Sequence, residues 1–461
     1  MRYGRVMAIQ LPRGPRAFPI VGHIPGLMRD PLQFLTELAR KHGDVVPFAM
    51  GRQPAVLMND PALIQRVIHD RSFERSAATR RALDSFLGPG LLSLEGVTHR
   101  QHRRLMAPAF HRERIQRYVA LMADETYAVL DRWRVGETRD LRADMMHLTF
   151  AIVARALFST ETSNVANRVD EAVRRVSQVL LPYAMLSRLV KFELPIVYGP
   201  RARAAIAQLN ALVRGIVVER RAEKRDRGDL LSMLLATRDE DGAALSDEDI
   251  CAEALTIMLA GHDTTAHTMT WAWFLLSQHP QLQQLLVDEV QSVVGDRQIT
   301  AEDLPRLTFA DRVMRETLRL YPPSWWADRV SQTDAELAGY FIPANTLMVF
   351  STWVTQRDDR WFAKAARFDP DRFLPDRATS IPEGAYLPFG AGVHVCIGNT
   401  FALMEGRMIL AAMAQRFAYQ AVRPQQVRPK PLITLGMAEP FPVAVRARSN
   451  PAANVVSASH A

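Results

Sequence analysis

The alternation of apolar and polar residues predicts a mainly helical chain with short strands near its start. In residues 31–42 the apolar side chains recur every three or four positions, as in an amphipathic helix. Two short apolar runs, 45–50 and 55–59, flank the turn Gly51-Arg52-Gln53-Pro54 and predict a pair of strands. Helical spacing then dominates from residue 61 to about residue 278.

This helical region has one predicted interruption, at residues 83–94, where Gly88-Pro89-Gly90 forces a loop. Further along the chain, helical spacing returns at 281–294 and 307–320, whereas residues 336–350 have strand character. We therefore expect a single, mostly helical domain with a few small β-sheets.

The longest predicted helix begins after Ser246 and continues to Leu276, before Pro280. Ser246 is a suitable N-cap, and Asp249 follows three residues later, as in a capping box. About thirty residues at ~1.5 Å each give roughly 45 Å, enough to cross a whole domain. Because the helix is apolar on several faces, we expect it to be buried.

Charge and cysteine content exclude several classes of function. The 461 residues carry a formal net charge of +8, but the sequence has no long run of like charges and no nucleic-acid-binding motif. We therefore expect no nucleic-acid partner. The two cysteines form no paired motif, which excludes a disulfide framework and fits a reducing, cytoplasmic location. With no signal peptide and no apolar segment of about twenty residues, we expect no membrane anchor.

One cysteine stands in a setting that suits a metal-binding thiolate. The pattern F-x-x-G-x-x-x-C-x-G runs from Phe389 to Gly398 and contains Cys396. A helix predicted to start at Ile397 would offer unpaired N–H groups and a positive dipole end, which lower the pKa of a thiol. The surrounding glycines permit close backbone approach. A buried free cysteine is the alternative interpretation, and it is the one we prefer for Cys251.

The middle of the long helix contains residues that are costly in a buried helix. They are Gly261, Asp263 and Thr264, within the segment 260–265. Several such local costs together indicate a functional site. The alternative is a bend stabilised by bonds from side chains to the helix carbonyls.

Two other pairs lie on shared helix faces. Glu316 and Arg319 are three residues apart and can form an ion pair. His99 and Arg103 are four residues apart, and together they suit the binding of an anion. A solvated basic face is the alternative interpretation of this second pair.

Taken together, these motifs resemble those of the cytochrome P450 family, in the family's order and spacing from about residue 11 to residue 440. The resemblance implies a single triangular, mainly α domain over residues 11–447. It leaves an amino-terminal tail at 1–10 and a disordered carboxyl-terminal tail at 448–461. Gln356-Arg357-Asp358-Asp359 departs from the more usual H-R-D-P, which puts one structural contact in doubt.

The resemblance also implies roles for individual residues. Cys396 is the axial ligand of haem b, and Asp263 and Thr264 pass protons, with O2 as the co-substrate. Glu316, Arg319 and Arg372 form a structural triad. Other implied cofactor contacts are His99, Arg103, Ala260, Gly261, Arg329, Pro388, Phe389, Gly390, His394 and Gly398. Implied substrate-pocket residues are Phe86, Leu87, Leu259, Trp325, Trp326 and Met437, together with a segment near 179–192 that contains Leu180 and Leu181.

The implied function is a haem-thiolate monooxygenase that hydroxylates or epoxidises an apolar terpene, fatty acid, steroid or polyketide. One alternative is a peroxide-driven peroxygenase, a class that usually lacks the acid–alcohol pair. Another is a non-catalytic haem-binding module, which needs no proton relay.

Separate electron-donor proteins are also expected. The haem domain uses up the length of the chain, and no G-x-G-x-x-G fingerprint occurs. We expect a ferredoxin and a ferredoxin reductase as donors and a monomeric enzyme. Arg100, Arg104 and Arg112 would face outward to meet the ferredoxin.

Overall fold

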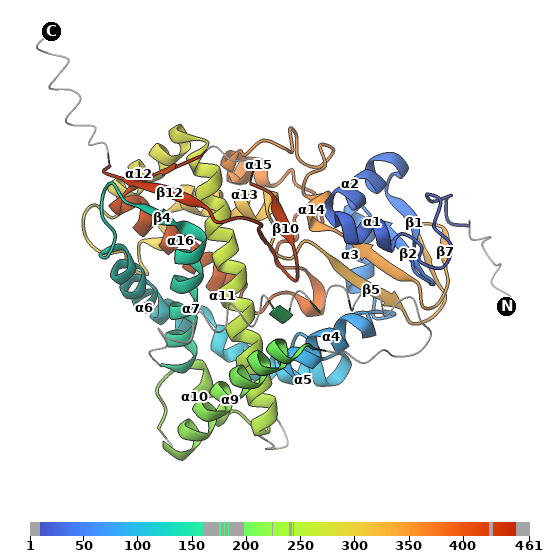
Figure 1. The fold of residues 1–461 in the computed structure, drawn as a ribbon, viewed down its shortest axis with the longest axis horizontal. Helices are drawn as coiled ribbons and strands as arrows, with labels where there is room; N and C mark the ends of the chain where they lie inside the picture. Colours follow the sequence, from blue (N-terminus) through green and yellow to red (C-terminus); the bar gives the residue numbers. More distant parts are fainter. Residues whose placement is uncertain are drawn as a thin grey trace, which may run out of the picture.

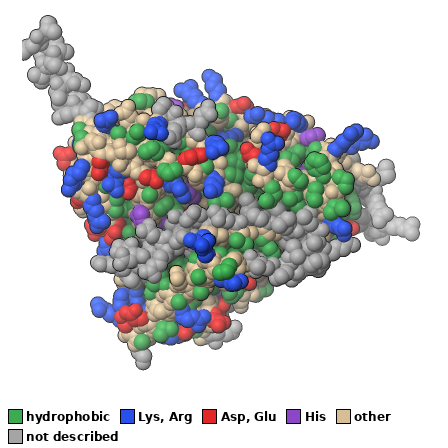
Figure 2. Space-filling model, in the orientation of Figure 1, with side chains coloured by type: hydrophobic (Ala, Val, Ile, Leu, Met, Phe, Trp, Pro, Cys, Tyr) green, Lys and Arg blue, Asp and Glu red, His purple; other side chains and the backbone are tan. Residues whose placement is uncertain are grey.

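The computed structural model describes residues 10–159, 198–223, 225–238 and 244–423, residues 427–448, and the single positions 175, 176, 179, 183 and 242. The outline is roughly triangular (Figure 2), and lysine and arginine side chains are scattered over the face shown there, with acidic side chains between them. Most helices lie on one side of the molecule and the larger sheet lies on the other (Figure 1). No helix in the described part of the chain is long and apolar enough to cross a membrane.

The long helix α11, Asp247–Ser277, runs through the helical half of the molecule (Figure 1). The predicted capping box is confirmed, because Ser246 Oγ accepts from the N–H of Asp249 and the Asp249 carboxylate accepts from the N–H of Ser246. The helix is buried over nearly all of its length. It therefore forms a scaffold that holds the polar segment 260–265 in the interior.

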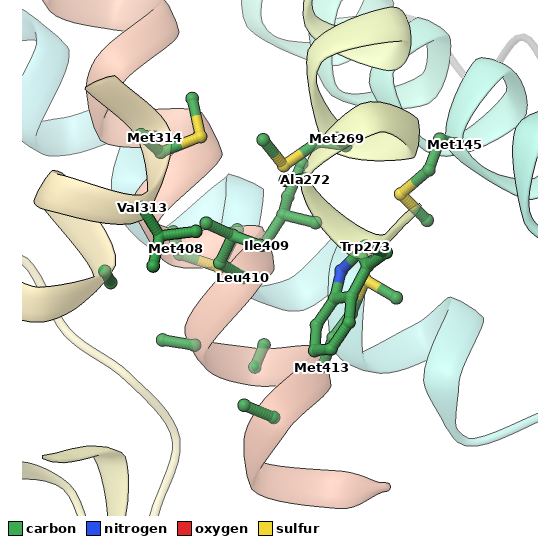
Figure 3. Packing of buried hydrophobic residues seen from close by; sticks show 14 of the residues in the cluster. Met145, Met269, Ala272, Trp273, Val313, Met314, Met408, Ile409, Leu410 and Met413 are labelled. Atoms are coloured by element: carbon green, nitrogen blue, oxygen red, sulfur yellow. The ribbon is translucent and has the colours of Figure 1, made fainter. Parts of the chain in front are cut away.

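The main apolar core lies where α11 packs against α7 (Leu141–Phe158), α13 (Thr308–Leu320) and α16 (Asn399–Arg416). Figure 3 shows methionines from all four helices in this core, with Trp273 of α11 beside Met413 of α16. An unbranched thioether adapts to irregular gaps between helices, which explains the use of methionine at this junction.

The other helices surround this core and the sheets. They are α1 Ile24–Arg29, α2 Pro31–His42, α3 Pro61–His69, α4 Ala77–Leu87, α5 Gly96–Met106, α6 Arg112–Leu130, α9 Pro200–Glu223, α10 Leu230–Ala236, α12 Pro280–Val293, α14 Thr352–Thr355 and α15 Pro375–Ala378. Short 3-10 helices occur at Ala107–Phe110, Leu304–Arg306, Pro370–Phe373 and Gly392–His394.

The larger sheet has the strand order β1-β2-β8-β5-β3. Its strands are β1 Val45–Met50, β2 Gln53–Met58, β8 Leu347–Phe350, β5 Ala327–Ser331 and β3 Phe73–Glu74. The parallel pairing of β2 with β8 joins residues almost 300 positions apart in the chain. The smaller sheets are β4 Thr138–Asp140 with β12 Pro442–Arg446 and β9 Ala418–Ala421, β6 Ala335–Leu337 with β7 Tyr340–Ile342, and β10 Pro429–Pro431 with β11 Leu435–Met437.

Several predicted boundaries need correction. The amphipathic helix at residues 31–42 is confirmed as α2, but β2 begins two residues before the predicted strand. The predicted interruption at 83–94 is shorter, because α4 continues to Leu87. The helix after the cysteine begins at Asn399, not at Ile397. Residues 1–9 and 449–461, which include most of the two predicted tails, lie outside the described residues.

Candidate active site

A cavity of about 470 Å³ lies between α11, α5 and the loop that carries Cys396. Apolar side chains from several helices and loops supply most of its surface, with α4 and α11 among them, and the polar groups gather near the cysteine loop and the segment 260–265. The loop after α4 closely approaches α11, because a Cβ on Gly88 would lie only 3.2 Å from Cβ of Ala252. Because Gly88 has no side chain, the loop can lie directly against the helix.

The cysteine loop presents its sulfur to this cavity. Cys396 is an exposed residue, and it is one of those that line the cavity. Gly390 and Gly392 have φ values of 67° and 66°, a left-handed conformation that favours glycine. Enclosure by protein raises the pKa of the Cys396 thiol, whereas the N–H of Gly398 and the charge of Arg103 lower it. A bound cation would add strongly to these last two effects.

A chain of four polar side chains lies beside the cysteine loop, and three of them, Arg75, His99 and His394, line the cavity. Arg75 Nε donates to Glu95 Oε1 over 2.7 Å, and Glu95 Oε2 lies 2.9 Å from Nε2 of His394. Nδ1 of His394 lies 3.1 Å from Nε2 of His99. Burial raises the pKa of Glu95, but the hydrogen bond with His394 and the charge of Arg75 outweigh it and hold this pKa at about 2. Burial and the neighbouring cations lower the pKa of His99 to about 3.

Arg103 and Arg329 also line the cavity, and with the chain of polar side chains beside the cysteine loop they form a cationic edge of the cavity. Arg103 Nη1 donates to the carbonyl of Val395 over 2.6 Å, and Arg329 Nη1 donates to the carbonyl of Asp328 over 2.7 Å. Burial lowers the pKa of both guanidinium groups. In the part of the chain that the structure describes, neither forms an ion pair with a carboxylate. The edge therefore fits a ligand that brings its own negative charges, as the two propionates of a haem would.

On the opposite wall, α11 exposes Ala260, Gly261, Asp263 and Thr264 to the cavity. Thr264 Oγ1 donates to the carbonyl of Ala260 over 2.6 Å, as helical threonines commonly do. The Asp263 carboxylate accepts a short hydrogen bond from the hydroxyl of Thr434. A Cβ on Gly261 would lie 3.2 Å from Cγ2 of Val153, so this glycine also allows α7 to approach α11 closely.

Glu316, Arg319 and Arg372 lie in contact with one another, and all three are fully buried or nearly so. Arg319 donates from Nε and Nη2 to the two oxygens of Glu316 over 2.7 and 2.8 Å, and Arg372 Nε lies 3.3 Å from Oε1. Gln356, which departs from the usual family pattern, keeps a contact here. Its amide donates to the carbonyls of Leu318 and Arg319 and accepts from the N–H of Leu387, close to the cysteine loop.

The predicted pocket residues divide into two groups. Phe86, Leu87 and Leu259 line the cavity, as do Pro388, Phe389, Gly390 and Gly398 from the cysteine loop.

The structure places Trp325, Trp326 and Met437 away from the cavity lining. The indole of Trp325 donates to the carbonyl of Leu432, that of Trp326 donates to Asp328, and Met437 lies in the main core. Indole N–H groups and large apolar surfaces are satisfied by these contacts, so a pair of tryptophans is no reliable mark of a pocket. Leu180 and Leu181 lie outside the described residues.

Comparisons with known proteins agree with this geometry. A family model described as "Cytochrome P450" matches residues 12–440. The chain belongs to the cytochrome P450 family. It is 36% identical to cyclooctatin synthase of Streptomyces melanosporofaciens, over 91% of this chain and 92% of that one. It is 36% identical to pentalenene oxygenase of Streptomyces avermitilis, over 91% and 94% of the two chains, and 38% identical to cyclooctat-9-en-7-ol 5-monooxygenase of S. melanosporofaciens, over 88% and 89%.

The expected fold class is therefore confirmed as a single P450-like domain, mainly helical with small sheets. The protein is an oxidoreductase of the monooxygenase type that uses O2 and a haem with an axial cysteine thiolate. It acts on a small molecule and receives electrons from redox partners. The thiol in the cavity and the cationic edge around it fit that cofactor.

Proposed function

We propose that this cytochrome P450 hydroxylates or epoxidises a terpene. The observation that carries the proposal is the mainly apolar cavity of about 470 Å³ between Cys396 and α11, which is large enough for a small polycyclic molecule. The printed names of two relatives support the class, since pentalenene and cyclooctat-9-en-7-ol are terpenes. Fatty acids, steroids and polyketides are the other apolar classes that such a cavity admits.

Cys396 is the proposed axial ligand, and Arg103, Arg329, His99 and His394 are the proposed partners of the haem propionates. The haem supplies the oxygen-activating chemistry, which its thiolate ligand favours. The protein contributes a buried cationic edge that fixes the orientation of the cofactor. Because Arg103 also donates to the carbonyl of Val395, it links the propionate edge to the cysteine loop.

Asp263 and Thr264 are the proposed route for protons into the cavity. Asp263 is buried and Thr264 is only partly buried, and both border the space above the cysteine. A carboxyl group followed by a hydroxyl can hold a proton and pass it toward the reacting oxygen. The presence of this pair also argues against a peroxide-driven enzyme. Hydrogen peroxide already carries the protons that O2 lacks, so an enzyme that uses it needs no proton route.

A ferredoxin, reduced by a ferredoxin reductase, is the proposed electron donor of a monomeric, cytoplasmic enzyme. Support comes from α5, where His99 is buried and Arg103 borders the cavity, whereas Arg100 and Arg104 are exposed. The side chain of Arg112 lies outside the described residues. An acidic partner would gain mainly in association rate from this charge, and salt would screen the gain. The cytoplasmic location is supported by the two unpaired cysteines.

The substrate class is tested by difference spectroscopy followed by product analysis. Purified holoprotein is titrated with cyclic terpenes, fatty acids and steroids, and the ligands that shift the Soret band are incubated with ferredoxin, reductase and NADPH. We expect terpenes to give the strongest shift and a product heavier by one oxygen. Preferential oxidation of fatty acids or steroids would contradict the proposal.

Ligand assignment is tested separately with the two cysteines. Cys396→Ser should abolish the red-shifted absorption of the reduced, carbon-monoxide-bound protein, whereas Cys251→Ser should retain it. The opposite pattern would move the ligand to Cys251.

A further inference from the structure

The Asp263 carboxyl group is held on two sides by residues that no family motif above contains. Its Oδ2 accepts the short hydrogen bond from Thr434, which lies in the turn of the β10–β11 hairpin. Its Oδ1 lies 3.5 Å from Nε2 of His267, one helical turn further along α11. The carboxyl group is therefore fixed between its own helix and a hairpin that follows it by about 170 residues.

The hairpin is shaped to accept the His267 ring. A Cβ on Gly436 would lie only 2.4 Å from Cε1 and 2.7 Å from Nε2 of His267, so any side chain at this position would displace the ring. The imidazole thus occupies the space that the glycine leaves open. Gly436 of β11 and Thr434 of the turn are two residues apart, and both lie beside the Asp263 carboxyl group or the His267 ring next to it.

Rigid neighbours hold the turn in place. The indole of Trp271 donates to the carbonyl of Leu435 over 3.3 Å, and the indole of Trp325 donates to the carbonyl of Leu432 over 2.9 Å. The N–H of Leu435 donates to the carbonyl of Pro323 over 3.0 Å. Thr434 is therefore presented to Asp263 by a backbone that is fixed on both sides.

The same turn also borders the substrate space. Ile433 and Thr434 line the cavity, and Ile433 is 39% exposed. A molecule in the cavity can therefore touch the turn that holds the Asp263 carboxyl group.

We propose that Thr434 and His267 are positioning residues that hold the Asp263 carboxyl group ready for proton delivery. The inference rests on the proposed role of Asp263 and Thr264. Thr434 donates to Oδ2, which leaves Oδ1 as the oxygen that carries the proton. That proton leaves Oδ1 for the cavity by way of the Thr264 hydroxyl. The carboxylate that remains is stabilised by Thr434 until water reprotonates Oδ1.

The test compares coupling in matched variants of the holoenzyme. Thr434→Val removes the hydroxyl with little change of shape, and Thr434→Ser restores it. Thr270→Val is the control, because Thr270 is a buried threonine of α11 that bonds only to the carbonyl of Ala266 among the described residues. The measurements are peroxide released per NADPH, the solvent isotope effect on turnover, and the substrate dissociation constant from the Soret shift.

Thr434→Val should lower turnover about tenfold, the effect of losing one hydrogen bond to a charged group, and should raise both the peroxide yield and the solvent isotope effect. The substrate dissociation constant should change little. Thr434→Ser should recover most of the coupling, and Thr270→Val should behave like the wild type. Unchanged coupling and isotope effect in Thr434→Val would overturn the proposal.

His267 gives a second, independent arm should Thr434→Val lose its haem. His267→Leu removes the ring nitrogen near Oδ1 and should uncouple the enzyme, whereas His267→Gln retains a polar group that can accept from protonated Oδ1 or donate to the carboxylate, and should remain largely coupled. Equal coupling in these two variants would also overturn the proposal. Asp263→Asn and Thr264→Ala serve as references. If they uncouple the enzyme while the Thr434 and His267 variants do not, only the positioning role fails; if they remain coupled, the proton relay itself is wrong.

Discussion

Two buried acids, Glu316 on α13 and Asp263 on α11, have very different surroundings. Glu316 is bound by two guanidinium groups and by the N–H of Asp369, so both of its oxygens accept hydrogen bonds and Oε1 accepts three. Among the described residues, Asp263 has one hydroxyl donor and a histidine at 3.5 Å. A carboxylate with cationic donors on both oxygens is fixed in its contacts, whereas one with fewer donors keeps an oxygen available to other partners. This difference in donors fits the structural role expected of Glu316 and the proton-carrying role proposed for Asp263.

The largest expected effect is that of Glu316→Gln. It would leave two buried guanidinium groups without their carboxylate, a loss that typically costs about 3–5 kcal/mol of stability. We expect little folded, haem-loaded protein, measured as the yield of the thiolate–carbon monoxide spectrum and by urea unfolding. Glu37→Gln removes a solvent-exposed partner of Lys41 and is the matched control, which should unfold like the wild type. A stable, haem-loaded Glu316→Gln protein would contradict the structural role of Glu316 and with it the difference between the two acids.

Asp263→Asn should have the opposite profile. Since Asp263 has few partners among the described residues, we expect the variant to fold, bind haem and bind substrate normally. Turnover should fall by about a hundredfold because the proposed proton carrier is lost. Thr264→Ala should instead release more peroxide per electron. Steady-state turnover and peroxide assays distinguish the two variants. Wild-type coupling in both would reduce the segment 260–265 to a structural bend.

Glu253 on α11 is an intermediate case that sharpens the comparison. Its buried carboxylate accepts from the N–H of Leu91 and lies 2.8 Å from Nδ1 of His102, and this hydrogen bond raises the pKa of His102 above 6.5. The ion pair therefore stabilises the fold fully below pH 6.5, and this contribution is lost as the pH rises through the higher, folded-state pKa. Glu253→Gln should lower the free energy of unfolding by about 1–3 kcal/mol at acidic pH and by less at alkaline pH. Urea titrations across this range measure the difference, and a pH-independent loss would contradict it.

The smallest effect is expected at Glu405 on α16. Burial raises the pKa of this carboxyl group well above its ordinary value of 4.5 and outweighs a contact with Thr265. The stability that the protonated Glu405 carboxyl group contributes is fully present below pH 4.5, and it is lost as the pH rises through the pKa of this group in the folded state. Glu405→Gln resembles the neutral acid, so the variant should match the wild type in acid and melt slightly higher at alkaline pH. A lower melting temperature at alkaline pH would show that the anion has a partner.

Features encoded by neighbouring residues could be predicted from the sequence, and features that join distant segments could not. The helix α2, the capping box of α11 and the cysteine loop depend on residues within a few positions of one another. Glu95 and Arg75 complete the charged edge, but they stand outside any motif and meet His394 only through the fold. Thr434 was missed for the same reason, since nothing local marks a threonine in a hairpin turn as a partner of Asp263. Trp325 and Trp326 were predicted to line the pocket but do not line the cavity, because a large aromatic side chain suits a core as well as a pocket.

The distribution of thiols has a practical consequence for attaching probes. Cys251 is buried, and burial raises the pKa of its thiol, so it should react slowly with alkylating reagents. If Cys396 is the axial ligand, as proposed, its sulfur is bound to the haem iron in the holoprotein and is protected from the reagent. A cysteine introduced at an exposed position such as Arg104 would then be the one readily alkylated thiol of the holoprotein. A fluorophore or an electrode could be joined at that single site without first replacing any native residue.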